Sequence, residues 1–313
     1  MKRPIRGLIA ATVAAIALAG PAAAEGETLV LISHAPDSDS WWNTIKNAIE
    51  VAGEQLDVTV EYRNPPTGDL ADMARIVEQA TASQPDGIIV TIADMDVLRG
   101  PIAEAVDQGV PVITINSGTV EQSRELGALM HVGQPEYDAG FGAGERAKAA
   151  GATNFACVNH YITNPASVER CRGYADALGV ELGSSMIDSG LDPAEVKNKV
   201  LAYLNANEDV DAILTLGPNS AIPTISAVQE LGLEGEMHFG TFDLSPEIAA
   251  AIKDGTIDFA IDQQPFLQGY LPVVILTNLA RYGVMPSGQI NSGPGFITNE
   301  NIALVEEFAG EYR

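Results

Sequence analysis

Short apolar runs alternate with longer amphipathic stretches along most of this chain. The first apolar runs are TLVLIS (28–33), VTVEYR (58–63), GIIVTI (87–92) and VPVITIN (110–116). Between them, at 41–56, 70–83 and 98–108, apolar residues recur every three or four positions. Runs rich in Val and Ile that alternate with helical segments are typical of βαβ units around a parallel sheet. The pattern therefore predicts an α/β lobe.

The same alternation restarts near residue 128 and predicts a second lobe of the same kind. Its expected strands are ALMHVG (128–133), NFACVN (154–159), SSMIDS (184–189), DAILTL (211–216), MHFGTF (237–242) and IDFAID (257–262). No linker rich in Pro, Ser or Gly separates the two halves. This organisation favours a cleft between two doubly wound lobes that close by hinge bending.

The first 24 residues have the features of a secretory signal peptide. A basic head, MKRPIR, precedes an apolar run of about 14 residues and the small-residue exit PAAAE, with cleavage expected after Ala24. The apolar run is shorter than the roughly 20 residues that a membrane-spanning helix needs. We therefore expect an exported protein that is free in the periplasm.

The charge of the chain is strongly acidic. It has 17 Lys and Arg against 42 Asp and Glu, a formal net charge of −25, and loss of the leader makes the mature chain more acidic still. Such a surface repels nucleic acid and anionic lipid, so neither is expected as a partner. We interpret the acidity mainly as a solubility feature.

The two cysteines, Cys157 and Cys171, are predicted to form a disulfide, because export places them in an oxidising compartment. A bridge closing a loop of this length contributes on the order of 3 kcal/mol. The alternative is two separate buried thiols.

No enzyme signature is present in the sequence. It contains no Walker A loop, no Gly-x-Ser-x-Gly elbow and no His-Glu-x-x-His. Gly140, Gly142 and Gly144 lie within a helical pattern, which favours close helix packing over a nucleotide loop. The DSDS segment at 37–40 lacks the glycine and glutamate of a calcium loop, and the four histidines lack zinc-ligand spacing. No cofactor or metal is expected.

Ligands of open α/β sheets lie beyond the carboxyl ends of the strands, and this rule selects the residues to examine. His34 and His160 end predicted strands, where a ligand role and a structural role are equally open. In SHAPDSDSWWNTIK (33–46), Asp39 accompanies Trp41 and Trp42 at the start of a predicted helix. A sugar needs flat aromatic walls for its C–H faces and polar side chains for its hydroxyls, which this stretch supplies. The alternative is that at least one indole anchors the core.

Taken together, these segments resemble the periplasmic sugar-binding proteins of the ribose-binding type, which serve ABC transporters and share a core with sugar-responsive repressors. The resemblance runs from about residue 28 to 302. It is carried by SHAPDSDSWWNTIKNAIE, QPDGIIVTIADMD, GVPVITINS, ERCRGY, GTFD and IDQQP. A leader stands where a repressor would have its helix-turn-helix, which indicates the transport branch.

The resemblance implies a type I periplasmic binding protein fold, α/β, with two doubly wound parallel-sheet lobes joined by a three-segment hinge. The crossings are expected near Ser117, Gln263 and Pro294. Lobe I is then 25–116 plus 264–293, and lobe II is 117–263 plus 294–313.

The resemblance also implies a set of ligand-binding residues. Asp94 matches a position where the family places an acidic residue that binds the sugar, and Asp96 is expected to cap the following helix. Arg170 matches the family's ligand-binding arginine, and Asn219 is a looser match to a ligand-binding position. The full expected set is Asp39, Trp41, Trp42, Asp94, Arg170, Asn219, Asp243 and Gln263, to which the strand ends add His34, His160 and Asn116.

Some positions depart from the ribose-binding pattern. Asn116 and Ser117 stand where an Asp-Arg pair is common, Pro65 and Pro66 interrupt a usually polar loop, and the cysteine pair is additional, so ribose itself is not expected. We hypothesise that the disulfide fixes Arg170 for bidentate contact with vicinal hydroxyls.

The function implied is capture of a neutral monosaccharide or polyol by a monomeric protein that delivers it to an ABC permease in the inner membrane. Three alternatives stay open at this point. The same fold could present a bound sugar to a chemoreceptor, could cage a cationic amine between Trp42 and the aspartates, or could be an enzyme.

Overall fold

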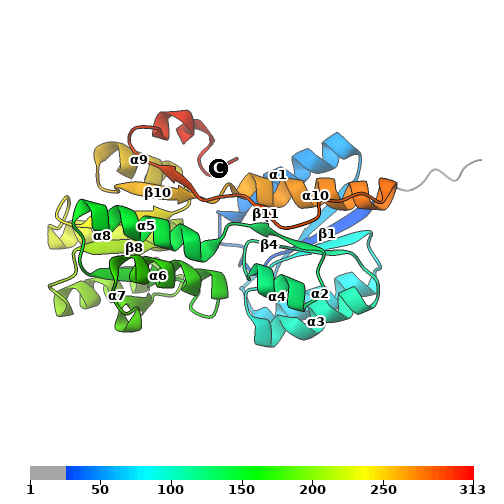
Figure 1. Cartoon of the computed structure of the whole chain (residues 1–313), viewed down its shortest axis with the longest axis horizontal. Coiled ribbons are helices and arrows are strands. Elements are labelled where there is room, and N and C mark those ends of the chain that lie inside the picture. Colours follow the sequence, from blue (N-terminus) through cyan, green and yellow to red (C-terminus); the bar gives the residue numbers. More distant parts are fainter. Residues whose placement is uncertain (1–25) are drawn as a thin grey trace, which may run out of the picture.

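The structure is a computed structural model that describes residues 26–313; the expected signal peptide lies outside these residues. The chain forms two α/β lobes side by side, each a six-stranded sheet with helices on both faces (Figure 1). Both lobes and their doubly wound arrangement were predicted from the alternating pattern.

Lobe I is built on the sheet β11-β5-β4-β3-β1-β2, in which all strands are parallel. Its strands are β1 (Thr28–Ile32), β2 (Thr59–Arg63), β3 (Gly87–Val90), β4 (Val112–Ile115), β5 (Met130–Gly133) and β11 (Ile290–Asn291). Its helices are α1 (Trp42–Leu56), α2 (Leu70–Ala82), α3 (Met95–Asp107), α4 (Val120–Glu125) and α10 (Pro265–Tyr282).

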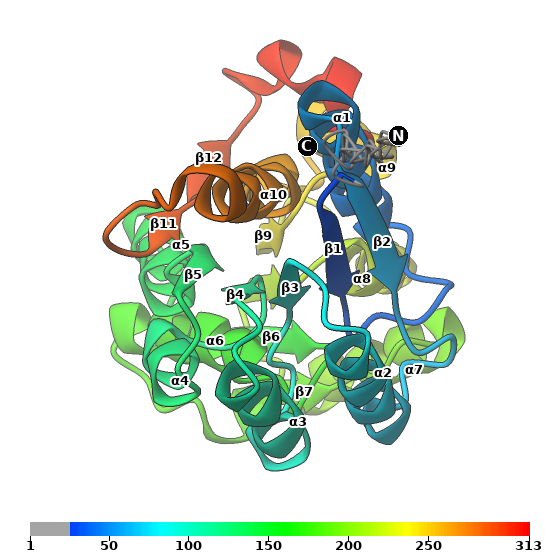
Figure 2. The same cartoon turned by 90° about the vertical axis from the view of Figure 1, so that its right-hand side faces the viewer.

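The strands of lobe I are buried on both faces, which explains their continuous apolar sequences. Leu29 and Leu31 of β1 face a cluster with α1 and α10, whereas Val30 and Ile32 face a cluster with α2 and α3. Figure 2 shows α1 and α10 on one side of the sheet and α2, α3 and α4 on the other. Two apolar layers therefore sandwich one sheet.

Lobe II repeats this plan on the sheet β12-β10-β9-β8-β6-β7. Its strands are β6 (Phe155–Asn159), β7 (Met186–Asp188), β8 (Ala212–Thr215), β9 (His238–Phe242), β10 (Phe259–Asp262) and β12 (Gly295–Ile297), the last antiparallel to β10. Its helices are α5 (Glu136–Ala150), α6 (Pro165–Leu178), α7 (Pro193–Ala206), α8 (Pro218–Leu231) and α9 (Pro246–Asp254). Short 3₁₀ turns lie at Gly183–Ser185, Ile302–Leu304 and Glu306–Phe308.

The first crossing between the lobes does not lie at Ser117, where it was expected. Strand β5 pairs with β4 in the sheet of lobe I, so residues 117–133 belong to lobe I and the chain crosses after Gly133. Helix α4 has only six residues, so this β-α-β unit is short. The restart of the alternating pattern near residue 128 was therefore interpreted as the beginning of the second lobe. The other two changes of sheet lie between Asp262 and Pro265 and between Asn291 and Gly295.

The predicted disulfide is present. Cys157 on β6 and Cys171 on α6 are bonded, with their Cα atoms 5.8 Å apart, and both side chains are fully buried. The bridge ties the strand and the helix that flank the loop at the carboxyl end of β6.

The glycines of α5 allow close packing against α6, as the sequence predicted. A Cβ added at Gly140 would lie 2.0 Å from the carbonyl oxygen of Arg170, and one at Gly144 would lie 2.6 Å from that of Tyr174. Across the interface, a Cβ at Gly173 would lie 2.2 Å from the carbonyl oxygen of Tyr137. The two backbones are thus in contact, and α5 sets the position of the turn that carries Arg170.

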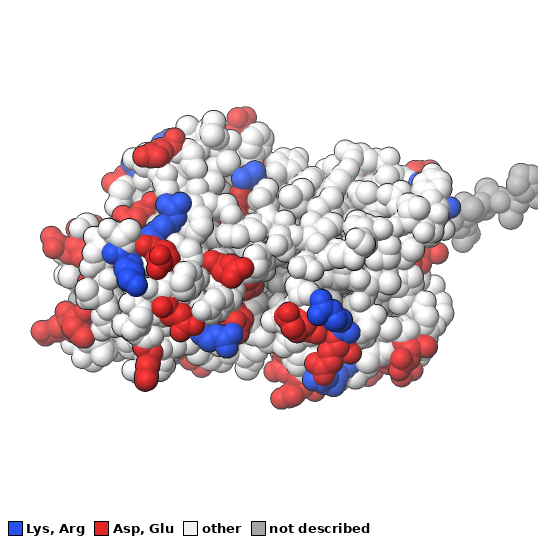
Figure 3. All heavy atoms as spheres, in the orientation of Figure 1, with Lys and Arg blue, Asp and Glu red and all other residues white. Residues whose placement is uncertain are grey.

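On the face shown in Figure 3, acidic and basic side chains are interspersed over both lobes, and mostly uncharged residues lie along the zone between them. Within residues 26–313, no helix is both long enough and apolar enough to span a bilayer.

Candidate functional site

A polar cavity lies between the lobes at the carboxyl ends of the strands. Its empty volume, with the open solvent at its mouth included, is about 440 Å³. Its lining residues come from both lobes: His34, Asp39, Trp41, Trp42, Asn116, Ser117, His160, Tyr161, Asn164, Ala166, Ser167, Arg170, Leu216, Gly217, Pro218, Asn219, Asp243 and Gln263. All of the expected ligand residues except Asp94 are in this set.

Asp94 does not line the cavity. Its Oδ1 accepts hydrogen bonds from the backbone N–H groups of Asp96 and Val97, at 2.8 and 3.3 Å, and so caps the start of α3. The expectation that Asp96 would cap this helix was therefore wrong, since Asp96 lies in its first turn. A ligand role for Asp94 stays a prediction.

The two indoles form adjacent parts of the cavity wall. Trp42 is 2% exposed and also belongs to the apolar core against α10, so one indole is indeed a core anchor. The ring of Trp41 meets that of Trp42 edge to face at 5.2 Å, and its buried Nε1 has no hydrogen-bond partner within the described chain. Trp41 therefore offers the cavity both an apolar surface and a free donor.

The two strand-end histidines lie in the cavity wall, His34 buried and His160 half-buried, and both are neutral at pH 7. Burial lowers the pKa of His34 to about 4, and burial together with the charge of Arg170 lowers the pKa of His160 to about 3. Nδ1 of His34 is 3.1 Å from the hydroxyl of Thr91, whereas Nδ1 of His160 is buried without a partner. His131, on β5, is likewise buried; its pKa is lowered to about 4, and it contacts Thr114. We refer to His34, His131 and His160 as the neutral histidines.

Asp39 makes direct contacts across the cleft. The hydroxyl of Tyr161 in lobe II donates to its Oδ2 at 3.2 Å, Asn219 is a further donor, and its Oδ1 accepts from the backbone N–H of Trp41. Burial raises the pKa of Asp39, against the opposing effect of these donors. The lobes therefore meet at a buried carboxylate.

Arg170 is buried but its bidentate edge is already occupied. Its Nε and Nη2 donate to the two oxygens of Glu136 at 2.7 and 2.8 Å, and its Nη1 donates to the carbonyl of Leu216 at 3.2 Å. The guanidinium also stacks over Phe242 at 4.3 Å. Nη2 also donates to Oε1 of Gln263 at 3.5 Å. One of the five donors of an arginine is then left for a ligand, so the hypothesis of bidentate contact with vicinal hydroxyls does not fit.

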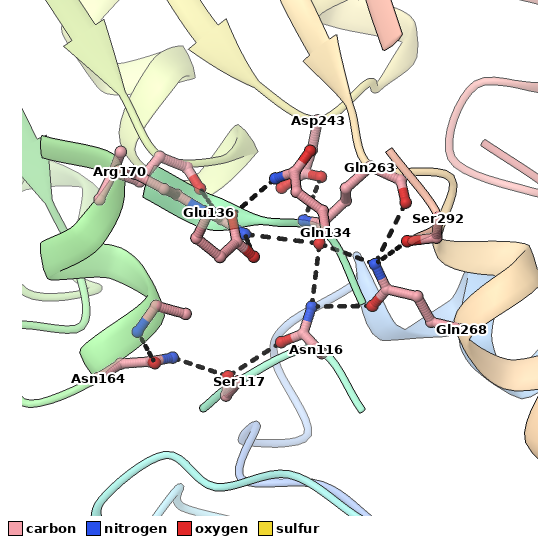
Figure 4. Close-up of polar contacts among 12 residues, drawn as sticks. Asn116, Ser117, Gln134, Glu136, Asn164, Arg170, Asp243, Gln263, Gln268 and Ser292 are labelled. Atoms are coloured by element: carbon pink, nitrogen blue, oxygen red, sulfur yellow. Dashed lines mark hydrogen bonds and ion pairs between the residues drawn. The ribbon is translucent and has the colours of Figure 1, made fainter. Parts of the chain in front are cut away.

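Asp243, with its hydrogen-bond partner Gln263, is the second buried carboxylate in the cavity wall besides Asp39. Asp243 follows β9 with a left-handed backbone, φ +67°, a conformation that Asp and Asn tolerate better than most residues. Nε2 of Gln263 donates to its Oδ1 at 2.7 Å (Figure 4). Burial raises the pKa of Asp243 to about 7, although Arg170 and Gln263 act in the opposite direction.

Two important residues were missed at the sequence level. Glu136 follows the first crossing and pairs with Arg170, and Tyr161 donates a hydrogen bond to Asp39 across the cleft. Both lie just beyond strand ends, where the ligand-edge rule places functional residues, in VGQPE and NHYITN. An acidic residue directly after a proline at a strand end was the available signal for Glu136, but its partner lies 34 positions away.

Two α/β lobes with a polar cavity between them define a solute-binding protein of the two-lobed periplasmic class. The model of the family "Periplasmic binding protein domain" matches residues 29–283, and the chain belongs to this family.

Individual relatives agree with this assignment. The xylose/arabinose-binding protein XylF of Sulfolobus acidocaldarius is 25% identical over 289 residues, which cover 88% of this chain and 71% of that protein. A carbohydrate transporter structure from Acidothermus cellulolyticus, in complex with myo-inositol, is 32% identical with a TM-score of 0.84, covering 91% of this chain and 98% of the other. A solute-binding protein of Burkholderia graminis in complex with D-arabinose shares the fold, with 20% identity, a TM-score of 0.81 and coverages of 89% and 97%.

Proposed function

We propose that this protein captures a neutral monosaccharide or polyol in the periplasm, between two closing lobes, and presents it to an ABC permease in the inner membrane. The observation that carries the proposal is the cavity itself, in which the two indoles of lobe I and polar groups from both lobes face one shared space. Flat rings suit C–H faces, and carboxylates and amides suit hydroxyls.

The charges of the cavity favour an uncharged ligand over an anion. Arg170 is neutralised by Glu136, and the two remaining acids, Asp39 and Asp243, would repel an anionic group. The myo-inositol complex of the 32% identical relative supports a ring of six hydroxyl-bearing carbons as the size to test first.

Capture follows from contacts that exist only when the lobes meet. Tyr161 and Asn219 reach Asp39 across the cleft, so a ligand held by both lobes shifts the population toward the closed form. The closed form is then what a permease recognises. The protein acts as a monomer, and it binds its ligand without transforming it.

Binding is tested by thermal shift and calorimetry of the mature protein with pentoses, hexoses, acyclic polyols and inositols. Asp243→Asn removes an acceptor that the proposal needs, and we expect it to weaken binding by about tenfold or more, in line with 1–3 kcal/mol for a buried partner left unpaired. The matched control is Asp258→Asn, a half-buried aspartate remote from the cavity. Absence of binding to every polyol, or equal effects of the two variants, would refute the proposal.

A cationic amine is a second candidate, favoured by one observation. Two buried carboxyls line the cavity while its arginine is already paired, so the lining carries uncompensated negative charge. Amino sugars and aminocyclitols in the same screen separate the two: tighter binding of the amine than of its hydroxyl counterpart would favour this candidate.

A further inference from the structure

Gln268 is a buried glutamine that lies behind the cavity and not in its wall. It is on the first turns of α10, has no exposed surface and is not among the cavity-lining residues. Figure 4 shows it between Asn116, Gln263 and Ser292. Two of these neighbours, Asn116 and Gln263, do line the cavity.

The hydrogen bonds around Gln263 allow its side-chain amide only one orientation. Its Oε1 receives three donors, Asn116 Nδ2 at 3.2 Å, Gln268 Nε2 at 3.1 Å and Arg170 Nη2 at 3.5 Å. A rotated amide would place its own N–H groups against these donors. Nε2 of Gln263 therefore points to Oδ1 of Asp243.

This orientation decides which oxygen of Asp243 remains for a ligand. Oδ1 is occupied by Gln263 at 2.7 Å. Oδ2 lies on the cavity side, where a Cβ added to the wall residue Gly217 would be 3.5 Å from it. Oδ2 is thus the acceptor presented to a ligand hydroxyl.

Gln268 also fixes the amide of Asn116. Its Oε1 accepts from Asn116 Nδ2 at 3.2 Å, and Oδ1 of Asn116 in turn accepts from the hydroxyl of Ser117. The Nε2 of Gln268 is held in place by the backbone carbonyl of Gln263, at 3.2 Å, and by Ser292 Oγ, at 3.0 Å. One side chain therefore joins two cavity amides to the segments where the chain changes lobe.

We propose that Gln268 is a positioning residue for ligand binding: it fixes the direction of the Gln263 and Asn116 amides and thereby presents Oδ2 of Asp243 to the ligand. The proposal rests on the proposed polyol-binding function. It assigns an affinity-determining role to a residue that touches no ligand.

Gln268→Met tests the proposal, because it keeps the length of the side chain and removes both polar atoms. The matched control is Gln264→Met. Gln264 lies at the same hinge segment and donates to the carbonyl of Ser292, but it contacts neither Gln263 Oε1 nor Asn116. Each variant is compared with wild type by calorimetry with the tightest polyol of the screen between pH 5 and 9, by melting temperature, and by a crystal structure without ligand.

We expect Gln268→Met to raise the Kd about tenfold, the effect of losing one orienting hydrogen bond, and Gln264→Met to leave it within about threefold. Gln263 donates to Asp243 and lowers the pKa of that carboxyl. Gln268→Met lets the Gln263 amide rotate away from Asp243, which should move the midpoint of the pH profile of affinity upward, whereas a purely structural change would not. The crystal structure should show a rotated Gln263 or Asn116 amide.

Gln268→Glu replaces the methionine variant if that one does not fold. The introduced carboxyl keeps an acceptor for Asn116, and it can donate to Gln263 only while it is protonated. We therefore expect an affinity near that of wild type at pH 5 and a weaker one than wild type at pH 8. The proposal would be overturned if the Gln263 and Asn116 amides keep their orientations and Gln268→Met changes the Kd no more than Gln264→Met does. If wild type binds no polyol, the proposed function fails, and the amide orientations in the ligand-free structures still decide the role of Gln268.

Discussion

The buried pair of Glu136 and Arg170 offers the sharpest quantitative prediction. The two side chains are 4% and 8% exposed and share two hydrogen bonds of 2.7 and 2.8 Å. Truncation by Glu136→Ala leaves the guanidinium with only the carbonyl of Leu216 at 3.2 Å and the amide oxygen of Gln263 at 3.5 Å. A buried charge stranded in this way costs about 3–5 kcal/mol.

Urea unfolding at pH 7, under non-reducing conditions, measures this cost as a free energy. Thermal unfolding is the second measurement: at about 2–4 °C per kcal/mol for chains of 150–250 residues, the melting temperature should fall by roughly 10 °C. Glu306→Ala is the control, because Glu306 pairs with Lys253 on the surface of the same lobe, with side chains 36% and 53% exposed. Exposed pairs of this kind contribute only about 0–1 kcal/mol.

A double variant separates loss of charge balance from loss of packing. Glu136→Leu with Arg170→Met removes both charges, and replacement of a buried pair by apolar residues is often neutral for stability. We expect most of the lost stability to return, while ligand affinity stays low because Arg170 lines the cavity. If Glu136→Ala destabilises no more than Glu306→Ala, Glu136 does not compensate a buried charge on Arg170 and the reasoning is refuted.

Three further outcomes are expected. Gly140→Ala should destabilise by about 1–3 kcal/mol in chemical unfolding, because its Cβ would meet backbone of α6 at 2.0 Å. Gly100→Ala on α3 should cost less, because an added Cβ would meet no atom within 4 Å outside its chain neighbours and only Pro101 opposes it. Similar effects of the two variants would contradict the packing argument. The double variant of Cys157 and Cys171 to serine should lose about 3 kcal/mol of unfolding free energy. It should also bind ligand more weakly, since the disulfide loop carries six cavity residues; a lower melting temperature with unchanged affinity would show that the disulfide has no role in the site. The neutral histidines have folded-state pKa values of about 3 to 4 against an ordinary 6.5, so the unfolded chain takes up more protons and stability falls as the pH drops from about 6.5 to 4. Asp243, whose pKa is raised to about 7, and Asp39, whose pKa is also raised, oppose this, but the three histidines outnumber them, so the unfolding free energy should fall on acidification; a flat profile would contradict it.

The sequence was sufficient to predict the features that depend on local pattern. Alternating apolar runs predicted the strands, and the strand-end rule selected the segments that hold His34, Asp39, His160 and Asp243, all of which meet in the cavity. The disulfide followed from the compartment and from having only two cysteines.

The features that were missed depend on tertiary pairing. Strand β5 has the same kind of sequence in either lobe, and only its pairing with β4 places it in lobe I. Asp94 and Asp96 are equally good caps by composition, and the backbone geometry of Asp94 decides between them. The partner of Arg170 could not be identified from a sequence that separates it from Glu136 by 34 positions.

The order in which the chain visits the two lobes has a consequence for biogenesis. Helix α1 lies near the beginning of the chain, but the helix that covers its apolar face, α10, begins only at Pro265. During synthesis, the apolar face of α1 therefore stays uncovered, and the sheet of lobe I stays incomplete, until about nine-tenths of the chain has been made. Long-range closure of this kind slows folding, so lobe I completes its fold only after most of the chain is available.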